Sequence, residues 1–144
     1  MQLHEMAGHL IRRLNQHSTQ VFSQHVQQIG YDLTPVQFAA MNAIASAPGI
    51  DQASIAAKIA YDKATIGGVI DRLEQKGYIL RTVSQRDRRA REVSLTPEGQ
   101  KLFDKMLPEV IALQRDILPG LNQDEYAQFI ALAYKAIAKE GKSG

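Results

Sequence analysis

The feature that most constrains the fold is a pair of short capped helices in the middle of the sequence. Asp51 and Asp62 each stand directly before a segment with helical apolar spacing, so each is predicted to be a helix N-cap. The second helix is expected over Lys63–Lys76 and to end at Gly77, because glycine readily takes the left-handed conformation that closes a helix. Two short helices in close succession are typical of a helix-turn-helix unit.

A basic β-hairpin is predicted directly after this pair. Residues 78–83 and 92–95 have strand-like composition and flank an arginine-rich loop. The net charge of the chain is only +2, but the basic residues of this region form one short stretch: Arg72, Lys76, Arg81, Arg86, Arg88, Arg89 and Arg91. Two short helices and then a basic hairpin are the parts of a winged helix, and a local basic face suits nucleic acid.

Longer helices are predicted on both sides of this unit. Apolar residues recur at three- and four-residue steps over Leu3–Ile29, and a capping box that begins at Thr34 starts the next helix. Further caps at Thr96 and Asn122 start two more helices. The predicted order is α-α-α-α-β-β-α-α, a mainly α fold with a small β-hairpin wing, and residues 142–144 are expected to be a frayed end.

Composition excludes several classes of function. The chain has no cysteine, which rules out disulfides, thiolate zinc sites and thiol redox sensing. No apolar run approaches a membrane span and the first residues lack a secretory pattern, so we expect a cytoplasmic protein with no membrane partner. Neither a metal site nor a cofactor is expected, because the histidines are spaced by five, eight and eight residues, which spreads them around a helix: His4, His9, His17 and His25.

The first half of the second short helix is predicted to read the major groove of DNA. Its candidate contacts are Lys63, Ala64, Thr65, Ile66 and Gly67. A threonine hydroxyl can hydrogen-bond a base or a phosphate, and Ala64 or Ile66 can contact a thymine methyl group. The pair Gly67-Gly68 either lets the backbone approach DNA closely or marks close helix packing, and the surrounding motif favours DNA.

The hairpin is predicted to contact the DNA backbone and the minor groove. Arg89 is the candidate for insertion into the minor groove, and Asp87 is expected to orient the loop by pairing with a nearby arginine. Phosphate contacts or loop support are expected from the remaining basic residues, with Arg72 on the preceding helix: Arg86, Arg88 and Arg91.

Several of these motifs resemble the MarR family, and the resemblance covers nearly the whole chain. The motifs are Leu73-Glu74 with Gly77, then Asp87-Arg88-Arg89, then Val93-Ser94-Leu95-Thr96-Pro97-Glu98-Gly99. The resemblance implies one domain over 1–144, with a winged helix-turn-helix lobe at 31–97 and a helical dimerisation region at 1–30 and 98–144. It also implies that Asp87 and Arg89 are the wing aspartate and the minor-groove arginine. Gly68 departs from the family, where many relatives carry a polar or basic residue.

An effector site is predicted on the first helix. His9, Arg12, Arg13 and Gln16 share one flank by their spacing, and adjacent arginines are costly to bury without an anionic partner. Resemblance to MarR-type repressors that answer aromatic carboxylates implies that Arg12 binds the carboxylate and that His9 or His17 bonds a ring substituent. Residues such as Tyr31, Phe38 or Met41 could then line the ring. The alternative is that Arg12 and Arg13 form salt bridges between two subunits.

These observations together predict a homodimeric, sequence-specific regulator of transcription on a pseudo-palindromic operator of double-stranded DNA. We expect a repressor that a small aromatic acid releases. One alternative is a winged-helix module that binds a protein partner and never DNA. A small hydrolase is the weakest alternative and the chain is not expected to be an enzyme, because Ser18, Ser23 and Ser94 lack the strand-turn-helix setting of a nucleophile.

Overall fold

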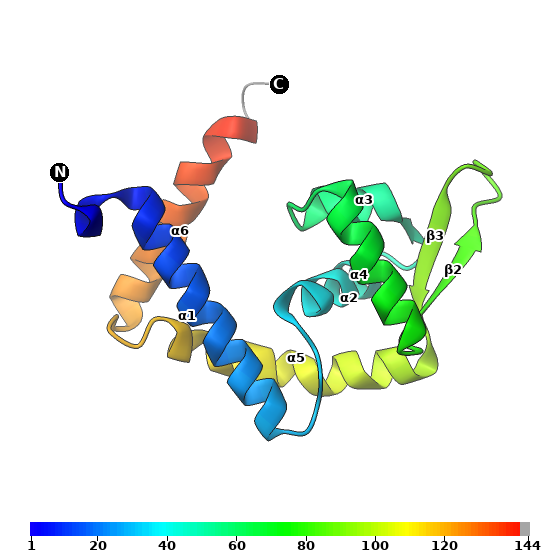
Figure 1. Ribbon diagram of the computed structural model, residues 1–144, viewed down its shortest axis with the longest axis horizontal. Helices are drawn as coiled ribbons and strands as arrows, with labels where there is room; N and C mark the ends of the chain where they lie inside the picture. Colours follow the sequence, from blue (N-terminus) through cyan, green and yellow to red (C-terminus); the bar gives the residue numbers. More distant parts are fainter. Residues whose placement is uncertain (142–144) are drawn as a thin grey trace.

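The computed structural model describes residues 1–141, with side chains described to residue 138, so the expected frayed end at 142–144 lies outside the described residues. A small sheet stands at one end of a set of helices (Figure 1). The elements in chain order are η1 (Leu3–Glu5), α1 (Ala7–Gln28), α2 (Pro35–Ser46), β1 (Ile50–Asp51), α3 (Gln52–Lys58), α4 (Lys63–Gln75), β2 (Ile79–Val83), β3 (Arg91–Leu95), α5 (Pro97–Ile117) and α6 (Gln123–Gly141). The predicted order is confirmed, with the short elements η1 and β1 added.

Local hydrogen bonds explain where the helices begin and end. At α2, the hydroxyl oxygen of Thr34 accepts from the Gln37 amide at 3.2 Å, and the Gln37 side chain accepts from the Thr34 amide at 3.1 Å. This is the predicted capping box, and each bond satisfies an amide that the first turn leaves free. After α4, Gly77 has φ +83°, a left-handed conformation that a side chain would strain.

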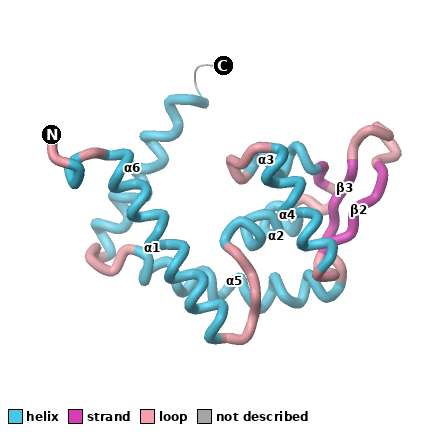
Figure 2. The backbone as a smooth tube through the Cα atoms, in the orientation of Figure 1, coloured by secondary structure: helices cyan, strands magenta, loops and turns pink. Residues whose placement is uncertain are grey.

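The sheet has three antiparallel strands in the order β1-β3-β2. β2 and β3 form the predicted hairpin, with Ile79 opposite Leu95 and Val83 opposite Arg91. The hairpin loop extends away from the helices (Figure 2). β1 was not predicted, because a strand of two residues is too short for alternation to appear in the sequence.

The elements from α2 to β3, residues 35–95, form what we call the winged lobe. Its core consists of side chains from α2, α3, α4 and both long strands: Ala40, Met41, Ile44, Ile55, Ile66, Ile70, Leu73, Ile79 and Val93. The first half of α5 closes this core, where the ring of Phe103 stacks on Phe38 with centroids 5.6 Å apart. Gly99 permits the approach, because a Cβ there would overlap the carbonyl oxygen of Tyr78.

The second half of α5 leaves the winged lobe and packs against α1. Val110 and Leu113 of α5 are buried in the same core cluster as Phe22 and Val26 of α1. A hydrogen bond of 2.7 Å between Nε2 of His25 and the Glu109 carboxylate joins the two helices. Pro108 lies inside α5, between the two halves of the helix.

The two ends of the chain form what we call the terminal arm: residues 1–21 and 114–138. None of its described side chains is buried. Large apolar side chains of the arm are exposed instead, among them Ile11, Ile130, Leu132, Tyr134 and Ile137. In the part of the chain that the structure describes, no helix combines the length and apolar character needed to cross a bilayer.

Candidate nucleic-acid interface

The start of α4 is held by Asp62. One carboxylate oxygen of Asp62 accepts from the Thr65 amide at 2.7 Å, and the other accepts from the Thr65 hydroxyl at 2.7 Å. These bonds, the backbone bond first, lower the pKa of Asp62 below its ordinary value. The hydroxyl hydrogen of Thr65 is therefore engaged, and its oxygen remains able to accept a bond.

The first turn of α4 has both exposed and buried residues. Lys63, Ala64 and Thr65 are exposed, as the prediction of a DNA-reading surface requires. Ile66 is fully buried, so the prediction that it contacts a thymine methyl group is wrong. Its side chain belongs to the inward face of the helix with Ile70, four residues further on, and that spacing was visible in the sequence.

Gly67 and Gly68 leave the backbone of α4 without side chains at two successive positions. A Cβ on Gly68 would meet nothing within 4 Å, and a Cβ on Gly67 would meet only the side-chain nitrogen of Gln52 at 3.4 Å, an ordinary contact. Close helix packing therefore does not require a glycine at either position. The other interpretation, that two glycines let the backbone approach DNA closely, stays a prediction.

The loop of the hairpin is a folded turn. The buried hydroxyl oxygen of Ser84 accepts from the amides of Arg86 and Asp87 at 3.1 and 3.3 Å. Asp87 in turn accepts from the amide of Arg89 at 3.0 Å and from its Nε at 3.3 Å. Asp87 therefore pairs with a nearby arginine, as expected, and the partner is the candidate minor-groove residue. The role of Ser84 was not predicted, because serine is common in loops and carries no signal of its own.

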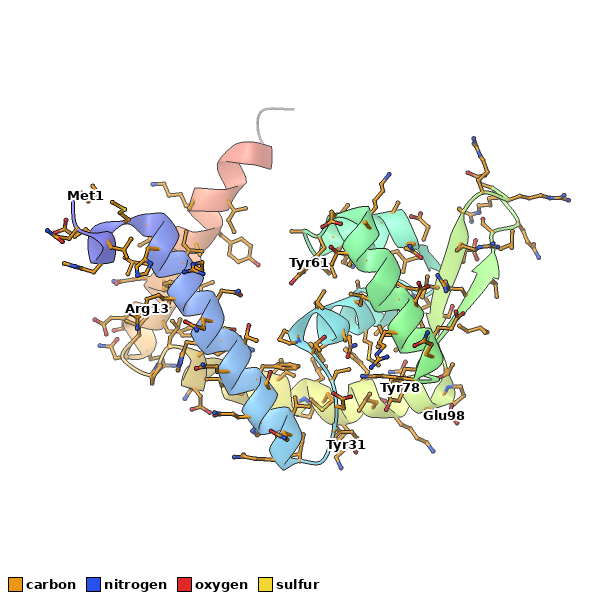
Figure 3. The ribbon with its side chains drawn as sticks, in the orientation of Figure 1. Met1, Arg13, Tyr31, Tyr61, Tyr78 and Glu98 are labelled. Carbon is orange, nitrogen blue, oxygen red and sulfur yellow. The ribbon has the colours of Figure 1, made fainter. Side chains whose placement is uncertain are left out.

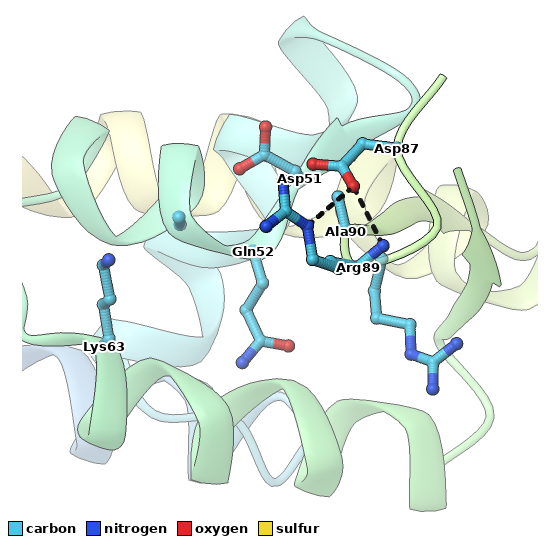
Figure 4. Close-up of a pocket in the computed structure, with 8 residues that line it drawn as sticks. Asp51, Gln52, Lys63, Asp87, Arg89 and Ala90 are labelled. Atoms are coloured by element: carbon cyan, nitrogen blue, oxygen red, sulfur yellow. Dashed lines mark hydrogen bonds and ion pairs between the residues drawn. The ribbon is translucent and has the colours of Figure 1, made fainter. Parts of the chain in front are cut away.

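Cations from α4 and from the wing face one groove. A groove of about 530 Å³ is lined by Lys63 of α4, by Arg89 and Arg91 of the wing, and by residues of α3 that include Gln52. Figure 4 shows Lys63 on one side and Arg89, with its dashed bonds to Asp87, on the other. The side chain of Arg89 is 93% exposed. The three other predicted arginine contacts are exposed but lie outside this groove: Arg72, Arg86 and Arg88.

The predicted effector residues do not form one pocket within a chain. Figure 3 shows Arg13 on the first half of α1 and Tyr31 just beyond the other end of that helix. The rise of a helix separates Arg12 from the end of α1 by about 25 Å. Met41 is fully buried in the core of the winged lobe, and Tyr31 carries the ammonium group of Lys105 over its ring at 5.1 Å.

One part of the predicted effector set lines an apolar cavity in the terminal arm. The cavity has a volume of about 600 Å³, and Arg13 and His17 of α1 are its charged and polar side chains. Its apolar wall comes from α1, the α5–α6 turn and α6: Leu10, Leu14, Ile117, Leu118, Leu121 and Phe129. Arg12 and Gln16 instead line a shallow surface depression beside Arg13. His9 is half-buried on the same helix and lines neither cavity.

Fold and surface thus define a winged-helix protein with a basic DNA-reading face, a class that includes many transcription regulators. Residues 33–90 match the MarR family. The chain is 33% identical over 135 residues to the transcriptional regulator HosA of Escherichia coli O157:H7, covering 94% of this chain and 97% of HosA. It is 31% identical over 140 residues to the transcriptional repressor NicR of Pseudomonas putida, covering 97% and 87% of the two chains.

Solved structures agree with these relatives. BpsR of Bordetella bronchiseptica has a TM-score of 0.87 and 29% identity, covering 94% of this chain and 96% of BpsR. The DNA binding of BpsR is regulated by 6-hydroxynicotinic acid. PcaV of Streptomyces coelicolor with its natural ligand has a TM-score of 0.86 and 28% identity, covering 94% of each chain. The chain belongs to the MarR family of transcription regulators, and it is a DNA-binding regulator.

Proposed function

We propose that the chain is a homodimeric repressor of a pseudo-palindromic operator and that a small aromatic carboxylate releases it. One observation carries the DNA part: the cations of the α4 start and of the wing face a single groove. In this arrangement α4 enters the major groove while Arg89 extends toward the adjacent minor groove. Because the proposed ligand is the operator, the expected compartment is the cytoplasm.

The proposed contacts fall into two groups. Lys63, Ala64, Thr65 and Gly67 present the exposed face of the α4 start to base edges. The remaining arginines contact phosphates on either side: Arg72, Arg86, Arg88 and Arg91. Asp87 acts on DNA only through Arg89, whose backbone and guanidinium it holds.

The terminal arm supports the dimer. An amphipathic helix with an exposed apolar face gains little from packing within its own chain, and α6 has no buried side chain among its described residues. A second copy would cover this face and would bring two α4 helices to successive major grooves. The proposed division is therefore a dimerisation region at 1–30 and 98–144 and a DNA-binding lobe at 31–97.

The cavity of the arm supports the effector. Its wall is apolar, as an aromatic ring requires, and the guanidinium of Arg13 can pair with a carboxylate. His17 lies with its Nε2 3.3 Å from the carbonyl oxygen of Asp116, which leaves the other ring nitrogen for a ring substituent. BpsR, with 29% identity, responds to 6-hydroxynicotinic acid, an acid of this chemical class.

The DNA assignment is tested by the variant Arg89→Ala. Removing one phosphate or groove cation should weaken binding to a duplex selected from random sequences and should lower the slope of log affinity against log salt by about 0.9. Fluorescence anisotropy over a salt series measures both quantities. Lys101→Gln, which removes an exposed cation of α5 outside the wing and α4, is the matched control. An Arg89→Ala protein with the affinity and slope of the wild type would remove the wing from the interface.

The effector assignment is tested by Arg13→Ala beside Arg12→Ala. We expect 6-hydroxynicotinic acid or benzoate to raise the melting temperature of the wild type and to release DNA. Arg13→Ala should lose both responses and keep DNA binding, because the winged lobe is unchanged. If Arg12→Ala alone loses them, the carboxylate lies at the depression beside Arg12. A wild type that responds to neither acid would contradict the proposed effector class.

A further inference from the structure

One arginine of the basic stretch faces inward. Arg81 lies in the middle of β2, and its Nη2 donates to the Asp71 carboxylate at 2.7 Å and to the Glu74 carboxylate at 2.8 Å. Its Nη1 lies 3.5 Å from the side-chain oxygen of Gln52. Because Gln52 begins α3 and the two acids lie on successive turns of α4, a single guanidinium connects the wing to both helices of the helix-turn-helix unit.

The charge of Arg81 is already matched within the lobe. Its side chain is 25% exposed, against 93% for Arg89 at the tip of the wing. The hydrogen bond from Arg81 lowers the pKa of Glu74, and the same bond raises the pKa of Arg81. Arg81 is therefore poorly placed to contact a phosphate, although it belongs to the same basic stretch of the sequence as the exposed arginines.

β3 is fixed at this level by β1, which pairs with Val93 and Glu92, whereas the outer half of β2 has no buried side chain. Ile79 and Val93 bury the base of the hairpin, but Thr82 and Val83 are exposed, and the next buried side chain of β2 and the loop is Ser84. Ser84 bonds within the loop itself, not to α4. Among the described residues, Arg81 thus makes the outermost side-chain hydrogen bonds between the wing and α4.

We propose that Arg81 is a positioning residue that fixes the angle between the wing and α4, so that α4 and Arg89 reach one duplex together. This inference rests on the proposed DNA contacts of α4 and the wing. Ion pairs between partly exposed groups add little to stability, so orientation is the larger effect expected from this cluster. A mobile wing would have to become ordered each time it binds DNA. The conformational entropy lost in that step weakens binding, although no contact is removed.

The first test compares Arg81→Gln with Arg89→Ala on the selected duplex. Arg81→Gln should weaken specific binding about tenfold and leave the salt slope unchanged, because no phosphate contact is lost. Arg89→Ala should lower the slope. A slope that falls by about 0.9 in Arg81→Gln would identify Arg81 as a phosphate contact and overturn the proposal. Circular dichroism establishes that each variant is folded at the assay temperature.

The second test removes the partners and keeps the arginine. The double variant Asp71→Asn with Glu74→Gln frees Arg81 and deletes two negative charges beside DNA, so a purely electrostatic role predicts tighter binding. The positioning role predicts weaker binding to the selected duplex and a smaller ratio over a random duplex. Arg81→Lys, which can reach one acid, should recover part of the loss of Arg81→Gln; no recovery counts against the proposal. If the wild type itself binds no duplex, the proposed function fails, and the positioning role fails with it.

Discussion

The winged lobe and the terminal arm are built on opposite principles. The lobe buries its large apolar side chains among its own elements and the first half of α5, with Met41, Ile44 and Ile66 fully enclosed. The arm buries none of its described side chains and exposes an apolar face on α6. Packing fixes the geometry of the lobe within one chain, whereas the geometry of the arm depends on what covers it.

This difference separates two tasks. A surface that must match the pitch of DNA needs rigid support, and the core of the lobe holds α4 and the base of the hairpin, where Ile66, Ile70 and Ile79 are buried. A region whose packing is completed from outside can respond to what completes it, because a ligand shifts an equilibrium only through its different affinity for the two arrangements. The cavity beside Arg13 lies in this second region.

The largest expected effect comes from placing charges on the exposed apolar face of the terminal arm. The double variant Ile130→Asp with Ile137→Asp places two charges on the exposed stripe of α6. Each isoleucine buried by a partner contributes about 2 kcal/mol, so the dimer should weaken by about 4 kcal/mol, or roughly a thousandfold. Sedimentation velocity should find monomers at micromolar concentration. Leu80→Asp, an exposed apolar residue of the lobe, is the control. A double variant that stays dimeric would show that another surface joins the subunits.

A smaller effect is expected where α5 closes the lobe. Gly99→Ala places a Cβ against the carbonyl oxygen of Tyr78, and the backbone of α5 must shift to relieve the overlap. We expect the free energy of unfolding to fall by about 3 kcal/mol, measured by urea denaturation. Gly68→Ala, where a Cβ meets nothing within 4 Å, should be neutral or slightly stabilising. Equal losses in the two variants would refute the tight closure of the lobe.

The smallest effect is a pH dependence at the wing. The pKa of Glu74 is lowered in the folded state, so its ion pair stabilises the fold above the pKa of unfolded glutamate. That stability is lost as the pH falls through the lowered folded-state pKa. At pH 7 the free energy of unfolding of the wild type should exceed that of Glu74→Gln by less than about 1 kcal/mol, since both Glu74 and Arg81 reach solvent. This difference should shrink as the pH is lowered. Thermal melts from pH 7 to pH 3 measure the difference between the two proteins, and a difference that does not narrow over this range contradicts the assignment.

Local chemistry could be predicted from the sequence, and long-range chemistry could not. The caps at Thr34, Asp51 and Asp62 need only residues three positions apart, and all three bonds are present. Which of Arg12 and Arg13 lines the cavity of the arm could not be told from the sequence, because the choice depends on the position of the α5–α6 turn. The bonds of Arg81 likewise join residues that are separated by as many as 29 positions.

Pro108 gives α5 a mechanical role. Proline has no amide hydrogen, so the carbonyl four residues earlier lacks its usual helical donor, and a helix bends most easily at such a point. This point lies between the half of α5 that closes the lobe and the half that packs on α1. α5 spans both regions and is thus most easily bent near its middle, so we expect any change in their relative orientation to be concentrated at Pro108.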